Sequence, residues 1–447
     1  MKETQLQIPL PGVPKAKQGR EVPPQWAWTE ASVWTERMVA TLERGIKGGK
    51  WYSLSDKVWK RENLERAWQK VRTKGGAAGV DGQSCEAYGR DSAQRLQRLQ
   101  DKLQKGHYRP SAVKRVWIPK LGSKELRPLG VPTVEDRIVE SAIRNVIEPI
   151  FEHIFAEHSY GFRPGRGAKD ALRRVDQLLK AGRVWVVDAD LKGYFDTIPQ
   201  APLMELVEEQ IADSRVLEWI EQMLKQGVME TAKGWRPTET GTPQGAVISP
   251  LLANIYLNPL DHAMARQGQE MVRYADDFVI LCESQTEAEA GLEQLRQWTA
   301  AAGLTLHPAK TRIVDANQKG GFDFLGYHFE RGHRWPRQKS RNKLRETIRQ
   351  QTWKRDARPL KDIIADVNRT LRGWFNYFQH SVRNVFERED GWVRQRLRTI
   401  QRRRHKGSGR ARGRDHQRWP NAYFAELGLF SLAIARAQAS HVRCRTH

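Results

Sequence analysis

An adjacent pair of aspartates interrupts an otherwise apolar segment and is the first candidate for chemistry in this chain. In residues 271–281 (MVRYADDFVIL), apolar residues flank Asp276 and Asp277 on both sides. Apolar runs around a two-residue polar break predict a β-hairpin with the aspartates at its turn. Neighbouring carboxylates repel each other, so they are stable only when they are solvated or neutralised by a cation. An ordinary solvated turn is therefore the alternative interpretation.

A second strand-like segment also ends in acid. Residues 184–190 (VWVVDAD) predict a strand that carries Asp188 and Asp190 on the same face, since strand side chains alternate. If this strand lies beside the hairpin in one sheet, three carboxylates could hold two divalent metals about 4 Å apart, as in-line phosphoryl transfer requires. The residues alone leave open whether Asp188 or Asp190 binds metal.

The motifs around these acids resemble those of a known family. Three segments are similar to the palm motifs of reverse transcriptases, namely DLKGYFD (190–196), GTPQG (241–245) and YADD (274–277). Their flanks resemble bacterial group II intron reverse transcriptase/maturases, and the resemblance covers about residues 50–447. It implies an α+β right-hand polymerase with fingers, a palm built on an antiparallel sheet, a helical thumb and a small basic C-terminal module.

The resemblance also assigns residues. It selects Asp190 over Asp188, because the family's catalytic aspartate precedes an aromatic by five residues, and Phe195 stands there. Catalysis is then expected from Asp190, Asp276 and Asp277. These three carboxylates, with Leu191, are expected to bind two Mg²⁺ ions, for which Mn²⁺ can substitute in vitro. Phe195 would exclude a 2′-hydroxyl and favour deoxynucleotides, although a buried core ring is nearly as good an interpretation from sequence.

Further contacts follow from the same resemblance. The expected nucleotide-binding residues are Arg127, Lys120, Phe195, Gln244 and Lys310, with Arg127 favoured over Lys120. The expected primer grip comprises Phe324, Leu325, Gly326 and Tyr327. Nucleic-acid contacts are expected from Arg163, Arg166, Arg402, Arg403 and Arg404, although charged runs are often only solvated surface.

Composition agrees with a polyanionic partner. The formal net charge is +24, which indicates nucleic acid more strongly than membrane. Three cysteines without metal-like spacing favour a reducing compartment over a disulfide framework or zinc site. No signal peptide and no apolar run of about 18 residues is present in the sequence. A cytoplasmic, nucleoid-associated bacterial protein without membrane contact is therefore expected.

Periodicity places the elements that carry these residues. We expect an extended leader over 1–25, a helix from Thr29 to Leu42, and one helix over 55–71. Separate thumb helices are expected over 343–353 and 360–374. The expected domains are a leader and helix (1–50), fingers (51–182), palm (183–335), thumb (336–385) and a basic DNA-binding region without an HNH nuclease (386–447).

The resulting hypothesis is an RNA-directed DNA polymerase encoded by a group II intron. It would bind intron RNA to promote splicing and would support mobility by target-primed reverse transcription. Its expected partners are the intron RNA template, a DNA primer or target, and deoxynucleoside triphosphates, with the oligomeric state left open. The alternatives are a splicing-only RNA-binding maturase, a related reverse transcriptase used in defence or repair, an RNA-dependent RNA polymerase, and a basic structural nucleic-acid binder. The target strand is not expected to be cut by this chain, since no nuclease pattern is present.

Overall fold

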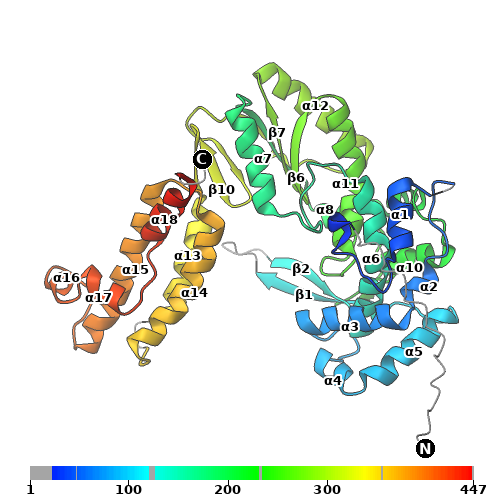
Figure 1. The fold of residues 1–447 in the computed structure, drawn as a ribbon, viewed down its shortest axis with the longest axis horizontal. Helices are drawn as coiled ribbons and strands as arrows, with labels where there is room; N and C mark the ends of the chain where they lie inside the picture. The colour runs from blue at the N-terminus through cyan, green and yellow to red at the C-terminus, as the bar shows by residue number, and fades with distance from the viewer. Residues whose placement is uncertain (1–22, 47, 120–125, 231–233, 354–355, 445–447) are drawn as a thin grey trace, which may run out of the picture.

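The computed structural model describes the backbone of residues 23–46, 48–119, 126–230, 234–353 and 356–444, and side chains up to residue 439. Almost all of the predicted leader (1–25) and the predicted nucleotide contact Lys120 lie outside the described residues. Within them, three sheets and three hydrophobic cores organise the chain. Figure 1 shows helices α13 to α18 gathered at one end of the molecule and α1 to α6 at the other.

A four-stranded antiparallel sheet holds both acidic segments. Its strand order is β6-β7-β3-β8, formed by β6 (Glu270–Tyr274), β7 (Asp277–Cys282), β3 (Trp185–Asp190) and β8 (Arg312–Asp315). Alternation sends Val186 of β3 to the core beneath α7 (Ala168–Lys180) and Val187 to the opposite core beneath α12 (Gln285–Ala301). The sheet is therefore covered by helices on both faces, as Figure 1 shows.

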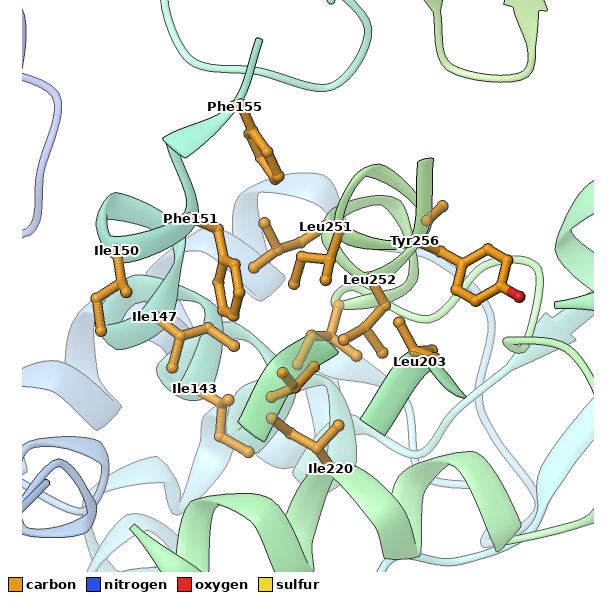
Figure 2. Packing of buried hydrophobic residues seen from close by; sticks show 14 of the residues in the cluster. Ile143, Ile147, Ile150, Phe151, Phe155, Leu203, Ile220, Leu251, Leu252 and Tyr256 are labelled. Atoms are coloured by element: carbon orange, nitrogen blue, oxygen red, sulfur yellow. The ribbon is translucent and has the colours of Figure 1, made fainter. Parts of the chain in front are cut away.

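The fingers are built around one long buried helix. Helix α6 (Val134–Ile154) is amphipathic over its whole length and contains Pro149. Its apolar side chains pack against α11 (Ser249–Arg266), α9 (Gln200–Glu208) and α10 (Ser214–Lys225), as Figure 2 shows. The hairpin of β1 (Val113–Pro119) and β2 (Leu126–Val131) continues into a second sheet with β4 (Val228–Glu230) and β5 (Gly234–Arg236).

Smaller helices complete the fingers and palm. These are η1 (Pro24–Trp26), α1 (Glu36–Arg44), α2 (Ser55–Val58), α3 (Arg61–Lys74), α4 (Cys85–Arg90), α5 (Ser92–Gln104) and α8 (Tyr194–Thr197). Two expectations were wrong here. The first helix begins at Glu36, where Thr35 accepts a capping hydrogen bond from the Met38 N–H. The helix expected over 55–71 is broken between Val58 and Arg61.

The thumb follows a small antiparallel sheet. That sheet comprises β9 (Phe322–Phe324), β10 (Tyr327–Glu330) and β11 (His333–Pro336). The helices after it are α13 (Gln338–Gln351), α14 (Leu360–Phe378), α15 (Arg383–Arg404), α16 (Arg414–Arg418), α17 (Asn421–Glu426) and α18 (Leu432–Cys444). They share one core, in which Ile364, Phe386, Phe424 and Leu432 are all buried. Helix α15 therefore runs unbroken across the predicted boundary at residue 386.

Candidate active site

The sheet register brings the predicted carboxylates together. In the antiparallel pairing of β3 and β7, Asp190 lies directly opposite Asp277. Directly opposed residues on one sheet face have Cβ atoms about 5 Å apart. Asp276 occupies the two-residue turn with Ala275, whose φ of +59° is left-handed. The predicted hairpin is confirmed, and both strand ends meet at one edge of the palm sheet.

Crowding of the acids disfavours their charged forms. Burial, followed by the repulsion from Asp188, Asp276 and Asp190, raises the pKa of Asp277 to about 7. Burial is also the main cause that raises the pKa of Asp276. It likewise raises the pKa of Asp188, to about 6. Lys310 Nζ lies 2.5 Å from Asp190 Oδ2, and Arg312 Nε lies 3.4 Å from Asp188 Oδ2. Protein cations thus neutralise two of the four carboxylates.

The donor set suits a hard divalent cation. Carboxylate oxygens are the ligands that Mg²⁺ prefers, and an ion between Asp190 and Asp277 would relieve the repulsion that raises the pKa of Asp277. The side chain of Leu191 is a hydrocarbon and lies in the core, so Leu191 can offer a metal ion only its backbone carbonyl oxygen. No group of three or more His, Cys, Asp or Glu side chains among the described residues already has the arrangement of a metal cage. The carboxylates therefore have the chemistry that a divalent cation requires. One of their oxygens, Asp190 Oδ2, is bonded to Lys310 in this structure.

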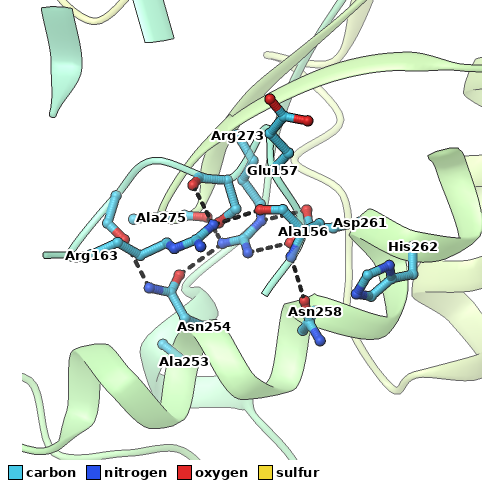
Figure 3. A network of polar contacts seen from close by, with 12 residues as sticks. Ala156, Glu157, Arg163, Ala253, Asn254, Asn258, Asp261, His262, Arg273 and Ala275 are labelled. Atoms are coloured by element: carbon cyan, nitrogen blue, oxygen red, sulfur yellow. Dashed lines mark hydrogen bonds and ion pairs between the residues drawn. The ribbon is translucent and has the colours of Figure 1, made fainter. Parts of the chain in front are cut away.

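A buried arginine supports the turn that carries Asp276. The side chain of Arg273 is 1% exposed, and its Nη1 donates to the Ala275 carbonyl at 3.0 Å and to Asn254 Oδ1 at 2.9 Å. Its Nε donates to Asp261 Oδ1 at 2.7 Å, and its Nη2 pairs with Asp261 Oδ2. Figure 3 shows this network reaching from α11 to the hairpin turn. Sequence reasoning missed Arg273, whose only signal was a charge inside an apolar strand.

A close backbone approach holds the same turn from the other side. The segment around Ser159 runs parallel to β6, and the Tyr160 N–H donates to the Arg273 carbonyl at 2.9 Å. A Cβ on Gly161 would lie 2.3 Å from the backbone nitrogen of Ala275, so only glycine fits there. Asn254 Nδ2 also donates to the Gly161 carbonyl at 2.7 Å. The YADD turn is therefore clamped between the Gly161 segment and Arg273.

The predicted nucleotide contacts meet on one side of the acids. Arg127 Nε donates to Gln244 Oε1 at 2.9 Å, and Gln244 Nε2 donates to Asp196 Oδ2 at 2.7 Å. Phe195, Asp196 and Gln244 line a cavity of about 330 Å³ together with Arg115 and residues of the 236–243 segment. Phe195 is half-buried and meets Phe162 edge to face. The structure thus brings Arg127, Phe195 and Gln244 together, and it places Lys310 on Asp190.

The Gln244 loop is also anchored to the fingers from behind. Gly130 of β2 donates its backbone N–H to the Gln244 carbonyl at 2.6 Å. A Cβ on Gly245 would lie 2.3 Å from the Gly130 carbonyl oxygen, so the two backbones are in close contact. Glu140 of α6 is fully buried and accepts from the Val247 N–H. Burial raises the pKa of Glu140 to about 8. Sequence reasoning missed Glu140, because nothing in the local pattern marks this acid as buried.

The segment predicted to be the primer grip forms a hairpin, and its turn is partly exposed. Leu325 and Gly326 form the turn between β9 and β10 and line a cavity of about 800 Å³ that also contains Asp277. Phe324 and Tyr327 are 0% and 1% exposed, so their side chains are core residues and not the predicted primer contacts. Tyr327 instead donates its hydroxyl to the Tyr377 carbonyl at 2.7 Å and ties the hairpin to α14.

Two predicted nucleic-acid contacts are structural. The side chain of Arg163 is 2% exposed and donates to both oxygens of Glu152 and to two backbone carbonyls. Arg166 donates to the Glu157 carbonyl and lies over the ring of Tyr160. The Ser-Tyr-Gly-Phe segment needs these bonds to close its turn at the end of α6. Arg163 is therefore a structural residue and not a nucleic-acid contact, whereas Arg166 supports the same turn with a side chain that is 31% exposed and stays a predicted contact.

The basic end of α15 is also partly satisfied internally. Arg402 pairs with Asp415 at 2.6 Å and donates to the Ser408 carbonyl. Arg404 donates to the backbone carbonyls of Asp356 and Arg358. Arg403 is exposed, and of the three it is the one without such a bond to another of the described residues.

Comparison with known proteins agrees with this site. Residues 118–329 match the family described as reverse transcriptase (RNA-dependent DNA polymerase), and residues 341–419 match the group II intron, maturase-specific domain. Protein YkfC of Escherichia coli (strain K12) is 36% identical over 292 residues, covering 57% of this chain and 76% of YkfC. The group II intron-encoded protein LtrA of Lactococcus lactis subsp. cremoris is 39% identical over 170 residues, covering 38% of this chain and 28% of LtrA.

A solved chain of a partial Cas6-RT-Cas1–Cas2 complex is 25% identical, with a TM-score of 0.37, over 55% of this chain and 42% of that chain. This chain therefore spans less than half of that chain and of LtrA.

The chain belongs to the reverse transcriptase family and has the right-hand polymerase fold. More narrowly, it is a reverse transcriptase and maturase of the group II intron type, because the maturase-specific domain follows the polymerase in the same chain. The family uses divalent metal ions and nucleic-acid substrates. No helix in the described residues is long and apolar enough to cross a membrane.

Proposed function

We propose that this chain extends a DNA primer with deoxynucleoside triphosphates on an intron RNA template, using two Mg²⁺ ions held by Asp190, Asp276, Asp277 and the Leu191 carbonyl. The observation that carries the proposal is the register of β3 and β7, which sets Asp190 opposite Asp277. The about 330 Å³ cavity at Gln244 and the about 800 Å³ cavity at Asp277 share no lining residue. They supply separate places for a nucleotide and a primer end.

Each nucleotide contact has a distinct task in this proposal. Arg127 carries the charge that a triphosphate requires, and Gln244 presents an amide to the sugar or base. Phe195 borders the same cavity, where a ring beneath the sugar selects against a 2′-hydroxyl. Lys310 would leave Asp190 and turn to the triphosphate when a metal ion takes its place. Lys120 stays a proposed contact from outside the described residues.

The chemistry depends on charge placement more than on proton transfer by side chains. Bound divalent ions supply Lewis-acid stabilisation of the reacting oxygens and the leaving pyrophosphate. Asp190 and Asp277 fix where those ions can bind, because both belong to paired strands. Arg273 and Gly161 hold the turn at Asp276, so the carboxylate spacing does not change as substrates enter.

Primer extension tests this proposal directly. Purified protein is given an annealed DNA primer, an RNA template, Mg²⁺ and deoxynucleotides, beside the double variant Asp276→Ala/Asp277→Ala. Asp315→Asn is the matched control, since Asp315 lies on the same sheet opposite Trp185, at the other end of β3. Extension by the wild type and the control alone supports the proposal. Equal extension by the double variant would contradict it, as would no extension by the wild type.

A second activity, intron RNA splicing, is proposed for the maturase part. Residues 341–419 match the maturase-specific domain and include α15, whose last turn carries Arg402, Arg403 and Arg404. Splicing needs RNA binding and not the palm carboxylates. The Asp276→Ala variant should therefore retain splicing of its host intron in vitro, and loss of splicing with unchanged RNA affinity would argue against the separation.

The remaining proposals concern the domain boundaries of the chain and its location in the cell. We propose fingers over 51–182 and a palm over 183–335, with a thumb from 336 and a basic DNA-binding region from 386 that shares α15 with the thumb. The common core of α14, α15 and α18 makes these last two parts one folded unit. A bacterial, cytoplasmic and nucleoid-associated location suits a net charge of +24.

A further inference from the structure

The guanidinium of Arg337 has no protein partner in the part of the chain that the structure describes. Arg337 stands between β11 and α13, where its backbone N–H donates to the Gly326 carbonyl at 2.9 Å. Its Nε is buried and meets no acceptor among the described residues. A buried donor of a cationic group is costly to leave unsatisfied. The arrangement is that of a site whose acceptor comes from another molecule.

Two arginines that are buried in the described part of the chain have their guanidinium groups satisfied internally. Arg273 pairs with Asp261, and Arg398 donates to the Trp419 carbonyl and to Asn421. Arg337 differs because it faces open space on two sides. It lines both the cavity of about 800 Å³ and a second one of about 350 Å³. A guanidinium at the junction of two cavities is placed to reach a ligand that passes from one to the other.

The lining of these cavities indicates the chemistry of that ligand. The larger one combines the aromatic side chains of Trp374 and Tyr377 with the exposed Lys343 and with the Leu325–Gly326 turn. The smaller one is lined by Trp335, by Arg312 and Arg341, which are paired with Asp188 and Glu389, and by the Asp323 carboxylate, so that Arg337 is its unpaired cation among the described residues. Flat apolar surface beside cationic groups suits a nucleotide chain, whose bases stack and whose phosphates carry charge.

The position of Arg337 relative to Asp277 indicates which nucleotide chain the ligand belongs to. Arg337 and Asp277 line the same cavity, and neither lines the cavity at Gln244. The ligand phosphate therefore belongs to a strand that approaches the carboxylates from the thumb side, and not to the incoming triphosphate.

We propose that Arg337 binds a phosphodiester of the primer strand close to its 3′ end and so positions the terminal hydroxyl at Asp277. This rests on the proposed polymerase function and adds to it a named residue and its ligand. One backbone hydrogen bond, from the Arg337 N–H to the Gly326 carbonyl, holds Arg337 beside the turn of the proposed primer-grip hairpin. Arg337 is a binding and positioning residue here, since it touches substrate away from the reacting atoms.

The test compares Arg337→Gln and Arg337→Lys with Lys339→Ala, a matched control that removes an exposed charge two residues away on α13. Affinity for a primer–template duplex is measured by fluorescence anisotropy, without nucleotides or catalysis. Primers carrying a single neutral methylphosphonate linkage at each of the last positions locate the contact. Thermal unfolding of each variant confirms that it is folded.

We expect Arg337→Gln to weaken duplex binding about tenfold or more and to reduce the slope of log affinity against log salt by about one. A methylphosphonate at one primer position should weaken duplex binding by the wild type and leave duplex binding by Arg337→Gln unchanged. The effect on Arg337→Lys should be intermediate. The KM for primer–template should rise more than kcat falls.

Equal affinities for Arg337→Gln and Lys339→Ala would overturn the inference, as would wild-type binding that is insensitive to every methylphosphonate. Extension by the wild type is recorded in parallel. If the wild type extends primers but Arg337→Gln binds normally, only this inference fails. If the wild type binds duplex and never extends it, the proposed polymerase function fails instead.

Discussion

Arg273 and Asp261 form a buried two-point ion pair, and the same guanidinium donates to the Ala275 carbonyl immediately before Asp276. Desolvating two charges is costly, so such a pair is a weak source of stability unless other bonds use it. Here the other bonds reach the turn that holds Asp276, one of the proposed catalytic carboxylates. The pair therefore links the rigidity of α11 to the geometry of the active site.

Breaking this pair should reduce stability and activity together. Asp261→Asn leaves the Arg273 charge buried with one weakened partner, so we expect a loss of about 3–5 kcal/mol in the free energy of unfolding. Replacing both residues, as Asp261→Leu/Arg273→Met, should recover much of that stability because no unpaired charge remains. It should not recover primer extension, because the Ala275 carbonyl has lost its donor. Chemical denaturation and extension assays measure the two effects, and full recovery of extension in the double variant would show that Arg273 is only a core residue.

The dependence on divalent metal should vary with pH. Burial and the repulsion from Asp188 raise the pKa of Asp277 to about 7, so protons compete with metal below that pH. The Mg²⁺ concentration for half-maximal extension should rise by up to about tenfold per pH unit below pH 7. Asp188→Asn removes one repelling charge and should move this rise to lower pH. Steady-state extension rates against Mg²⁺ concentration at pH 6, 7 and 8 give this half-maximal concentration. Identical pH dependence for the wild type and Asp188→Asn would refute the role of Asp188.

Glu140 should make stability fall as pH rises. Its folded pKa of about 8 lies above the ordinary value of 4.5, so the folded state keeps a proton that the unfolded state releases. The unfolded state is therefore favoured progressively across that window. Glu140→Gln has no proton to lose, and its unfolding free energy relative to wild type should increase from pH 5 to pH 8 by on the order of 1–4 kcal/mol. Urea unfolding at both pH values measures this difference, and a constant difference would contradict the assignment.

Asp196 should act on nucleotide binding through Gln244. Its carboxylate accepts from Gln244 Nε2, which leaves Oε1 to Arg127. Asp196→Ala frees the Gln244 side chain, and we expect the KM for deoxynucleotides to rise about 3–10-fold while kcat changes less. Thr197→Ala is the neighbouring control. A fall in kcat at unchanged KM would place Asp196 in the chemistry and not in positioning.

Local pattern was enough to predict the strands and the hairpin of the palm. Apolar runs in residues 184–190 and 271–281 located β3, β6 and β7, because these strands are buried on both faces next to an acidic end. Resemblance to a family then selected Asp190. The register that sets it opposite Asp277 is a relation between distant segments, and a one-residue slip would have turned every side chain to the other face.

Sequence reasoning failed where burial decided the role of a charged or aromatic residue. Arg163 stands in a basic glycine-rich segment that looks exposed, yet its partner Glu152 lies at the end of α6 and satisfies it. Phe324 and Tyr327 belong to the primer-grip motif, but strand alternation turns both into the core. Arg273 and Glu140 were missed because their partners, Asp261 and the Val247 N–H, come from a different element.

The most direct test of the central claim is the single-turnover rate of one nucleotide addition by Asp277→Asn, measured with saturating primer–template and Mg²⁺. Asn keeps the size of the side chain and removes only the charge opposite Asp190. The rate should fall about a thousandfold relative to wild type and Asp315→Asn, while the affinity for primer–template stays within about twofold. A rate equal to that of the control, with the same affinity, would show that these opposed carboxylates do not carry the reaction.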